Sequence, residues 1–167
     1  MNVIFLDIDG VLNCERTKER CRGMVGINPG KVELLKQTVD AVDASLVLVS
    51  SWKMFWEPQN KDLQDPLGDY IDESLGAFGL SVIDKTEDYG YNRGEGIIDY
   101  LSEHNVDKWV ILDDDVFPDY EETGCLEHLV RTNWADNGLT EKHCKKVINL
   151  FNKQSEPDSM ELAERGN

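Results

Sequence analysis

The sequence of 167 residues is short of positive charge, because 17 Lys and Arg stand against 33 Asp and Glu and leave a formal net charge of −16. Such a surface repels phosphate backbones, so binding of bulk duplex nucleic acid is disfavoured. A small local basic patch could still hold the end of one strand. The apolar content of 40% belongs to a globular chain that can bury a core, which excludes a disordered acidic tail.

Long hydrophobic runs are also lacking. No segment approaches the roughly 18 apolar residues of a membrane span, and the start MNVIFLDIDG carries two acids where a signal peptide carries basic residues. We therefore expect no membrane partner and a cytoplasmic location. The four cysteines form no C-x-x-C pair and have no histidine at zinc-finger spacing, so we expect reduced thiols and no soft-metal site.

Short apolar runs alternate with amphipathic segments along the chain. Strands are predicted at 2–6, 45–50, 80–83, 108–115 and 128–132, and helices at 28–44, 67–78, 93–105 and 140–151. This order predicts an α/β fold, a Rossmann-like doubly wound parallel sheet of about five strands. We expect a single domain over residues 1–152, a loop at 13–28, and a polar, flexible tail at 153–167.

Polar side chains follow the predicted strands at their carboxyl ends, where ligands bind in such folds. Asp7 and Asp9 follow the first strand, Ser50 and Ser51 the second, and residues 113–115 are three consecutive aspartates. Several carboxylates in one crevice repel one another unless a cation lies among them. Oxygen ligands select a hard ion, so the sequence predicts Mg²⁺ rather than zinc or copper.

The spacing of Asp7 and Asp9 suits phosphoryl transfer. A carboxylate held against a phosphoryl group is a competent nucleophile and can form an aspartyl-phosphate. A second carboxyl two residues on can protonate the leaving oxygen and then deprotonate the attacking water. Gly10 lets the backbone turn tightly after this pair. A serine hydroxyl and a nearby cation would then hold the phosphoryl oxygens.

Four segments resemble the motifs of the haloacid dehalogenase-like (HAD) hydrolases, which are Mg²⁺-dependent phosphohydrolases with an aspartate nucleophile. VIFLDIDGVLN resembles the first motif, LVLVSS the second, Arg93 before GEGIIDYL the third, and VILDDD the fourth, in the correct order over roughly residues 3–151. The resemblance implies a phosphoric monoester hydrolase. It implies catalytic roles for Asp7 and Asp9, phosphate binding by Gly10, Ser50, Ser51 and Arg93, and metal binding by Asp7, Asp9, Asp113 and Asp114.

Two assignments stay open at this point. The third-motif cation of the family is most often lysine, so Lys85 is the alternative to Arg93. In the fourth motif we favour Asp114 as the direct metal ligand, with Asp113 close by and Asp115 a solvated neighbour. Serine at position 50 replaces the usual threonine and keeps the hydroxyl.

The short gaps between motifs predict a minimal cap and an open site, which in this family implies an exposed phosphate on a macromolecule. The motifs look most like those of phosphatase domains linked to RNA repair, so we expect a nucleotide or nucleic-acid terminal phosphate as substrate. Trp52 and Trp56 either pack in the core or form a platform for a base. A phosphoprotein or small-metabolite phosphatase is one alternative. A non-catalytic phosphate-binding domain is another, although it would have no need of Asp9.

Overall fold

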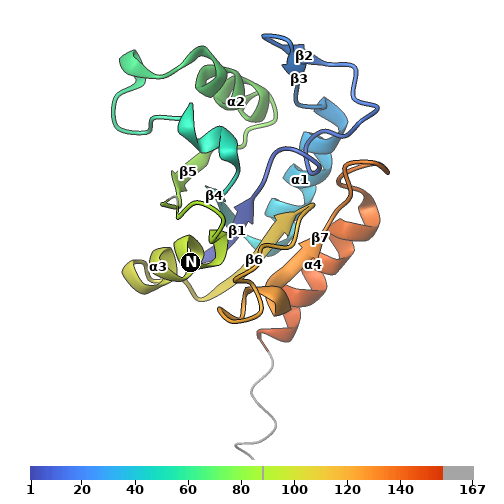
Figure 1. Cartoon of the computed structure of the whole chain (residues 1–167). Coiled ribbons are helices and arrows are strands. Elements are labelled where there is room, and N and C mark those ends of the chain that lie inside the picture. The colour runs from blue at the N-terminus through green and yellow to red at the C-terminus, as the bar shows by residue number, and fades with distance from the viewer. Residues whose placement is uncertain (88, 156–167) are drawn as a thin grey trace, which may run out of the picture.

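The main sheet of the computed structural model, which describes residues 1–87 and 89–155, has five parallel strands. Their order is β5–β4–β1–β6–β7 (Figure 1). The strands are β1 (Asn2–Leu6), β4 (Ala44–Leu48), β5 (Val82–Lys85), β6 (Lys108–Asp113) and β7 (Leu129–Arg131). The predicted α/β, Rossmann-like class with a five-stranded parallel sheet is therefore confirmed.

Four helices cover both faces of this sheet (Figure 1). They are α1 (Pro29–Val42), α2 (Pro66–Gly76), α3 (Arg93–Glu103) and α4 (Glu141–Lys153). Alternate residues of each strand point to opposite faces. Ile4 and Leu6 of β1 accordingly pack in the core under α1, α2 and α4, whereas Val3 and Phe5 pack with α3 on the other face.

The helix α1 begins and ends where local chemistry dictates. The Asn28 side chain accepts a hydrogen bond from the Lys31 amide, and Pro29 occupies the first helical position. At the other end, Asp43 adopts a left-handed conformation with φ of 49° and donates its N–H to the Val39 carbonyl. The predicted N-cap is thus confirmed, and the helix stops two residues before the predicted end.

The segment expected as a loop at 13–28 contains a small hairpin, which corrects that prediction. Strand β2 (Arg20–Cys21) pairs antiparallel with β3 (Met24–Val25). The connecting residues Arg22 and Gly23 both have positive φ, 48° and 83°, as a tight two-residue hairpin turn requires. Two-residue strands are too short to show an alternating pattern, so periodicity could not detect them.

Other boundaries differ by a few residues. The predicted strand at 80–83 lies at 82–85, because an edge strand tolerates the polar Asp84 and Lys85. Three short 3₁₀ helices occur as well: η1 (Ser51–Met54), η2 (Lys61–Leu63) and η3 (Cys125–His128). Helix α4 extends to Lys153, and the rest of the expected tail from residue 156 lies outside the described residues.

The four cysteines are all free thiols. In the described part of the chain, every helix is too short or too polar to cross a bilayer.

Candidate active site

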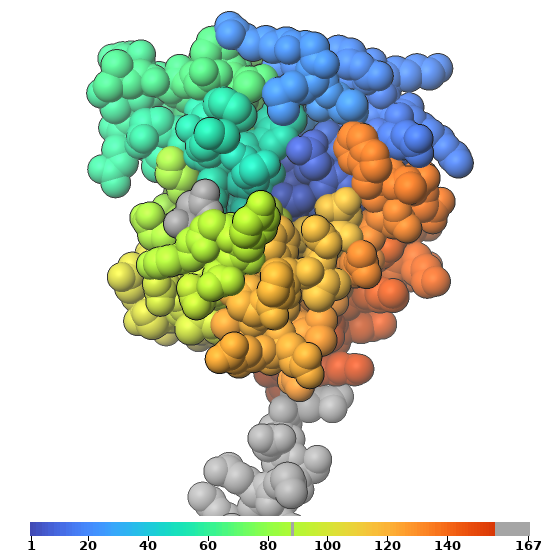
Figure 2. Space-filling model, viewed as in Figure 1, coloured from blue at the N-terminus to red at the C-terminus, as the bar shows by residue number. Residues whose placement is uncertain are grey.

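The strand order reverses between β1 and β6, and this is where the acidic residues converge. The chain passes from β1 outward to β4 and β5, then returns across the sheet to β6 on the other side of β1. Asp7 follows β1 and donates its N–H to the Leu112 carbonyl of β6 at 2.9 Å. In Figure 2 the dark blue segment after β1 lies in a recess between differently coloured parts of the chain. A reversal point of this kind is the expected ligand crevice of an open α/β sheet.

Three carboxyl groups lie together in this crevice. Oxygen atoms of Asp7, Asp113 and Asp114 all lie within 4.8 Å of one another. Asp7 and Asp113 are buried, and Asp114 is half-buried. Three hard oxygen donors at such distances fit a divalent cation such as Mg²⁺.

Burial and mutual repulsion disfavour the charged forms of these acids. Burial, followed by repulsion from Asp113, raises the pKa of Asp7 to about 8, although Arg93 and a hydrogen bond from Ser50 act in the opposite direction. Burial likewise raises the pKa of Asp113. Burial and repulsion from Asp113 raise the pKa of Asp114. A cation bound between the three groups would relieve this cost.

Arg93 is the cation that lies among these acids. Its Nη1 is 3.2 Å from Asp7 Oδ1 and 2.5 Å from Asp113 Oδ2, and its side chain is only 13% exposed. The guanidinium carbon lies 4.1 Å from the centre of the Phe117 ring. Burial lowers the pKa of Arg93, but the two carboxylates outweigh that effect and leave the pKa raised. Arg93 therefore remains charged and contacts Asp7, Asp113 and Phe117.

Lys85, the alternative to Arg93, is engaged elsewhere. Its Nζ donates to the carbonyls of Lys53 at 3.2 Å and Trp56 at 2.6 Å. It thus satisfies carbonyl groups in and after η1, and Arg93 is the residue that contacts Asp7.

The hydrogen bonds of Asp113 and the exposure of Asp114 bear on the choice of direct metal ligand. Asp113 accepts hydrogen bonds from Arg93, from Tyr120 Oη at 3.3 Å and from the Asp115 amide at 3.0 Å. Asp114 is half-buried and lines an open cleft together with Asp9. The preference for Asp114 as the direct metal ligand stays a prediction.

Gly10 lets the first loop approach Asp114. Its φ is +75°, which L side chains rarely adopt, and a Cβ atom there would overlap the carboxyl group of Asp114. The Gly10 carbonyl accepts a hydrogen bond from Thr132 Oγ1 at 2.6 Å. The glycine therefore permits a close contact between the two acidic loops.

The two serines after β4 lie differently. Ser50 is buried, and its hydroxyl hydrogen-bonds to Asp7. Ser50 Oγ also accepts from the Trp52 amide at 3.3 Å and so caps η1. Ser51 is exposed and lines a cleft with Arg93. Their predicted roles in phosphate binding stay predictions.

Asp9 lies beside the three clustered acids, and its predicted role as a metal ligand stays a prediction. Asp9 Oδ1 accepts from Asn13 Nδ2 at 2.9 Å, and Asp9 Oδ2 accepts from Trp52 Nε1 at 2.9 Å. The carboxyl group is therefore held by two neutral donors. This arrangement fixes the direction of the carboxyl group.

The two tryptophans predicted as a possible base platform are core residues. Trp52 is 1% exposed and Trp56 is 2% exposed. Trp56 Nε1 donates to Asp72 Oδ1 at 2.8 Å, as Trp52 Nε1 does to Asp9. A ring buried on both faces offers no surface for a base, so the packing alternative is correct.

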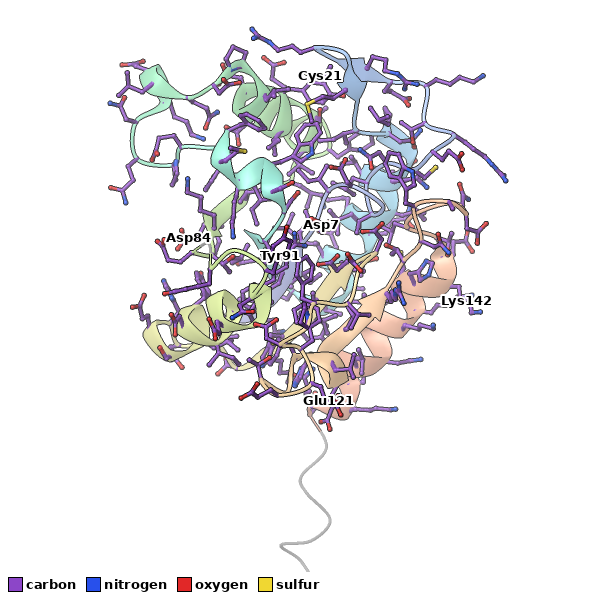
Figure 3. The ribbon with its side chains drawn as sticks, in the orientation of Figure 1. Asp7, Cys21, Asp84, Tyr91, Glu121 and Lys142 are labelled. Atoms are coloured by element: carbon purple, nitrogen blue, oxygen red, sulfur yellow. The ribbon has the colours of Figure 1, made fainter. Side chains whose placement is uncertain are left out.

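Two clefts lie beside the site. The aromatic residues that line these clefts were not identified from the sequence. One is lined by Ser51, Lys53, Arg93, Phe117 and others, including Tyr91, which is 84% exposed and is labelled with Asp7 in Figure 3. The other is lined by Asp9, Met24, Val25, Asp114 and Trp134. Single aromatic residues in loops carry no periodic signal, so only the fold could bring them here.

The start of α3, which carries Arg93, is fixed by another residue that the sequence did not reveal. Asp119 Oδ2 accepts from the Glu95 amide at 2.8 Å, so this loop residue satisfies a free N–H of the first helical turn. A Cβ atom at Gly94 would overlap Asp119 and Thr123. The loop after β6 and the start of α3 therefore pack closely, which holds Arg93 in position.

The five-stranded parallel sheet, with acids clustered at its reversal point, is consistent with a HAD fold. Residues 3–144 match the family model described as the HAD domain in Swiss Army Knife RNA repair proteins. The chain belongs to this family, which indicates a role as a HAD-type hydrolase. Comparison with curated proteins and with solved structures gives no match.

Proposed function

We propose that the protein is a Mg²⁺-dependent phosphomonoesterase that uses Asp7 as its nucleophile and removes the terminal phosphate of a nucleotide or nucleic-acid strand. The position of the Asp7 carboxyl carries this proposal. Asp7 lies at the reversal point of the sheet, 3.2 Å from the Arg93 guanidinium and within the cluster of three acids. The description of the family, which refers to RNA repair, supports a nucleic-acid substrate.

Asp7, Asp113 and Asp114 would hold the metal ion. Their oxygen donors and their raised pKa values fit a site that needs added positive charge. When bound, the ion would supply that charge to the carboxylates and to the phosphoryl oxygens. The unused N–H groups of Arg93 and the hydroxyl of Ser51 face the same cleft and would orient the phosphoryl group.

The reaction proceeds in two steps. In the first, a carboxylate oxygen of Asp7 attacks phosphorus, the bond from phosphorus to the leaving oxygen breaks, and Asp9 gives that oxygen a proton. In the second, Asp9 takes a proton from water as the water oxygen attacks phosphorus, and the bond from phosphorus to the Asp7 oxygen breaks. Inorganic phosphate leaves, and both carboxyl groups return to their starting states. The hydrogen bonds from Asn13 and Trp52 orient Asp9 for this proton transfer.

The test is phosphate release by the wild type and by Asp7→Asn, with Mg²⁺ and with a chelator. The substrates are an aryl phosphate, mononucleotides, oligonucleotides with a 3′- or 5′-phosphate, and a phosphopeptide. We expect release from the nucleotide substrates that is lost in Asp7→Asn and in chelator. If the phosphopeptide gave the highest rate, the substrate would be a phosphoprotein and not a nucleic acid. Activity of Asp7→Asn near the wild-type level would show that Asp7 is not the nucleophile. A folded protein that binds phosphate without releasing it would instead be a phosphate-binding domain.

A further inference from the structure

Basic side chains are concentrated in one short segment of this acidic protein. Residues 16–25, which we call the basic hairpin, lead into and form β2 and β3. They contain four of the 17 Lys and Arg of the chain and one acid, so their formal charge is +3 in a chain of −16. All four cations are exposed: Arg16, Lys18, Arg20 and Arg22.

These four cations have no acidic partner in the described residues. Within residues 1–87 and 89–155, none of the ion pairs closer than 4.0 Å includes any of them. Arg20 Nη1 donates only to the carbonyls of Thr17 and Glu19. The Glu19 carboxylate lies 3.4 Å from Asn28 Nδ2 at its nearer oxygen. The fold therefore does not use the charges of the basic hairpin.

The basic hairpin is anchored to the active site. Asn13, which is fully buried, donates to Asp9 at 2.9 Å and to the Val25 carbonyl at 3.3 Å. Behind the hairpin, the Ile27 amide donates to Tyr70 Oη of α2 at 2.9 Å. Figure 1 shows β2 and β3 above the end of the sheet to which β1 points.

The basic hairpin also forms a wall of the cleft beside Asp9 and Asp114. Met24 and Val25 line that cleft with these two acids, and Trp134 lies there as well. Arg22 precedes Met24 by two residues, so the two Cα atoms are at most about 7 Å apart. A ligand that leaves the acids along this wall meets cations, whereas one that leaves past Asp114 and Asp115 meets carboxylates.

We propose that the basic hairpin binds the phosphodiester backbone of a single nucleic-acid strand whose terminal phosphate lies at Asp7. The inference rests on the proposed function and names the substrate class more closely. A mononucleotide carries its charge at the reacting phosphate, so it has no use for four further cations. A strand brings additional phosphates, which the remaining acidic surface repels. The hairpin is short, so it suits a few phosphates of one strand and not a duplex.

The salt dependence of binding provides a quantitative measure. Each phosphate contact to a single strand contributes about 0.7 to the slope of log affinity against log salt. Four contacts therefore give a slope of about −3 and roughly a fiftyfold loss of affinity between 50 and 200 mM salt.

The test measures binding by fluorescence anisotropy in the full chain carrying Asp7→Asn, with labelled ten-residue oligonucleotides that end in a 3′- or 5′-phosphate. The hairpin variant is Arg16→Gln/Lys18→Gln/Arg22→Gln, and it keeps Arg20 because that side chain bonds the hairpin backbone. The matched control is Lys142→Gln/Lys145→Gln/Lys146→Gln, which removes the same charge from exposed positions on α4. Thermal unfolding checks that all variants fold.

We expect the hairpin variant to bind at least tenfold more weakly at 50 mM salt and to reduce the salt slope by about 2. The control should change affinity less than twofold. Equal losses of affinity in both variants would show that total charge alone matters. An unchanged affinity in the hairpin variant would show that the hairpin takes no part in binding. Either result overturns the inference.

The proposed function can fail independently of this inference. In the protein with Asp7 intact, the ratio of kcat/KM for oligonucleotide to that for mononucleotide should fall about tenfold in the hairpin variant. If phosphate were released from every nucleotide substrate with no change in this ratio, the phosphatase activity would stand, and the role of the hairpin in strand binding would be rejected. If strand binding depended on the hairpin but no phosphate were released, the strand-binding surface would stand, and the phosphatase activity would be rejected.

Discussion

The two sides of the candidate site hold positive charge in opposite ways. On the α3 side, Arg93 is largely buried and contacts the carboxyl groups of Asp7 and Asp113. On the hairpin side, Arg16 and Arg22 are exposed and, within the described residues, pair with no acid. A buried charge must be paired to be tolerated, whereas an exposed charge is solvated and costs the fold little. Arg93 is therefore part of the fold as well as the site, and the basic hairpin is available to a ligand.

The largest contrast in the free energy of unfolding is expected between a substitution of the buried Arg93 and one of the exposed Arg22. Arg93→Met keeps much of the side-chain volume but leaves two buried carboxyl groups without their cation. Removing one partner of a buried pair costs about 3–5 kcal/mol. Arg22→Met, at the exposed hairpin turn, should cost less than about 0.5 kcal/mol. Urea denaturation at pH 8 in chelator measures both, and similar losses in the two variants would contradict the comparison.

A second contrast uses two glycines with nearly the same backbone. Gly10 has φ of +75° and Gly23 has φ of +83°, but a Cβ atom overlaps Asp114 at the first and meets nothing within 4 Å at the second. Alanine at positive φ costs about 1–2 kcal/mol, and the overlap at Gly10 should add about 1–3 kcal/mol. Gly10→Ala should also weaken Mg²⁺ binding, because Asp114 must move. Denaturation and a Mg²⁺ titration of both variants test this, and equal behaviour would exclude the close contact.

The pH dependence of stability should report on the acids of the α3 side. Because the pKa of Asp7 is raised from 3.8 to about 8, the folded protein holds this proton over a pH range in which the unfolded chain has lost it. In the metal-free protein, the stabilisation is thus present below about pH 4 and is lost as pH rises toward 8. The wild type should lose stability relative to Asp7→Asn from pH 5 to pH 8.

Metal binding should show the reverse trend. Mg²⁺ must displace protons from the acids. The rise in Tm that Mg²⁺ causes should therefore be larger at pH 8 than at pH 5. The hairpin variant serves as a matched control and should show the same dependence as the wild type, because within the described residues none of its cations pairs with the clustered acids. A Mg²⁺ effect independent of pH would argue against binding at the clustered acids.

The parts of the site that sequence could predict are those attached to apolar strands. Residues 3–6 and 109–112 form continuous apolar runs, so the acids that follow them were expected at one end of a parallel sheet, and Asp7, Asp113 and Asp114 do meet there. Arg93 opens a helix with a clear apolar stripe, which explains why its position was predictable.

The unpredicted parts depend on contacts between loops. The strands of the basic hairpin have two residues each, too few for any periodic signal. Asp119 and Asn13 act through hydrogen bonds to groups elsewhere in the chain, and a sequence shows a polar residue without showing its partner. The aromatic pattern around Trp52 was ambiguous because an indole can stack on a ligand or pack in a core, and burial decided between the two.

The smallest expected effect concerns the orientation of Asp9. Trp52→Phe keeps an aromatic ring in the core but removes the Nε1–H that donates to Asp9 Oδ2. One oxygen of the proposed acid then loses its partner, which should lower kcat by roughly tenfold, as expected for the loss of a hydrogen bond worth about 1.5 kcal/mol. Because proton donation matters most when the leaving oxygen is strongly basic, the loss should be larger for an alkyl phosphate than for an aryl phosphate. Equal losses on both substrates would mean that Trp52 supports the fold around Asp9 without affecting its proton transfer.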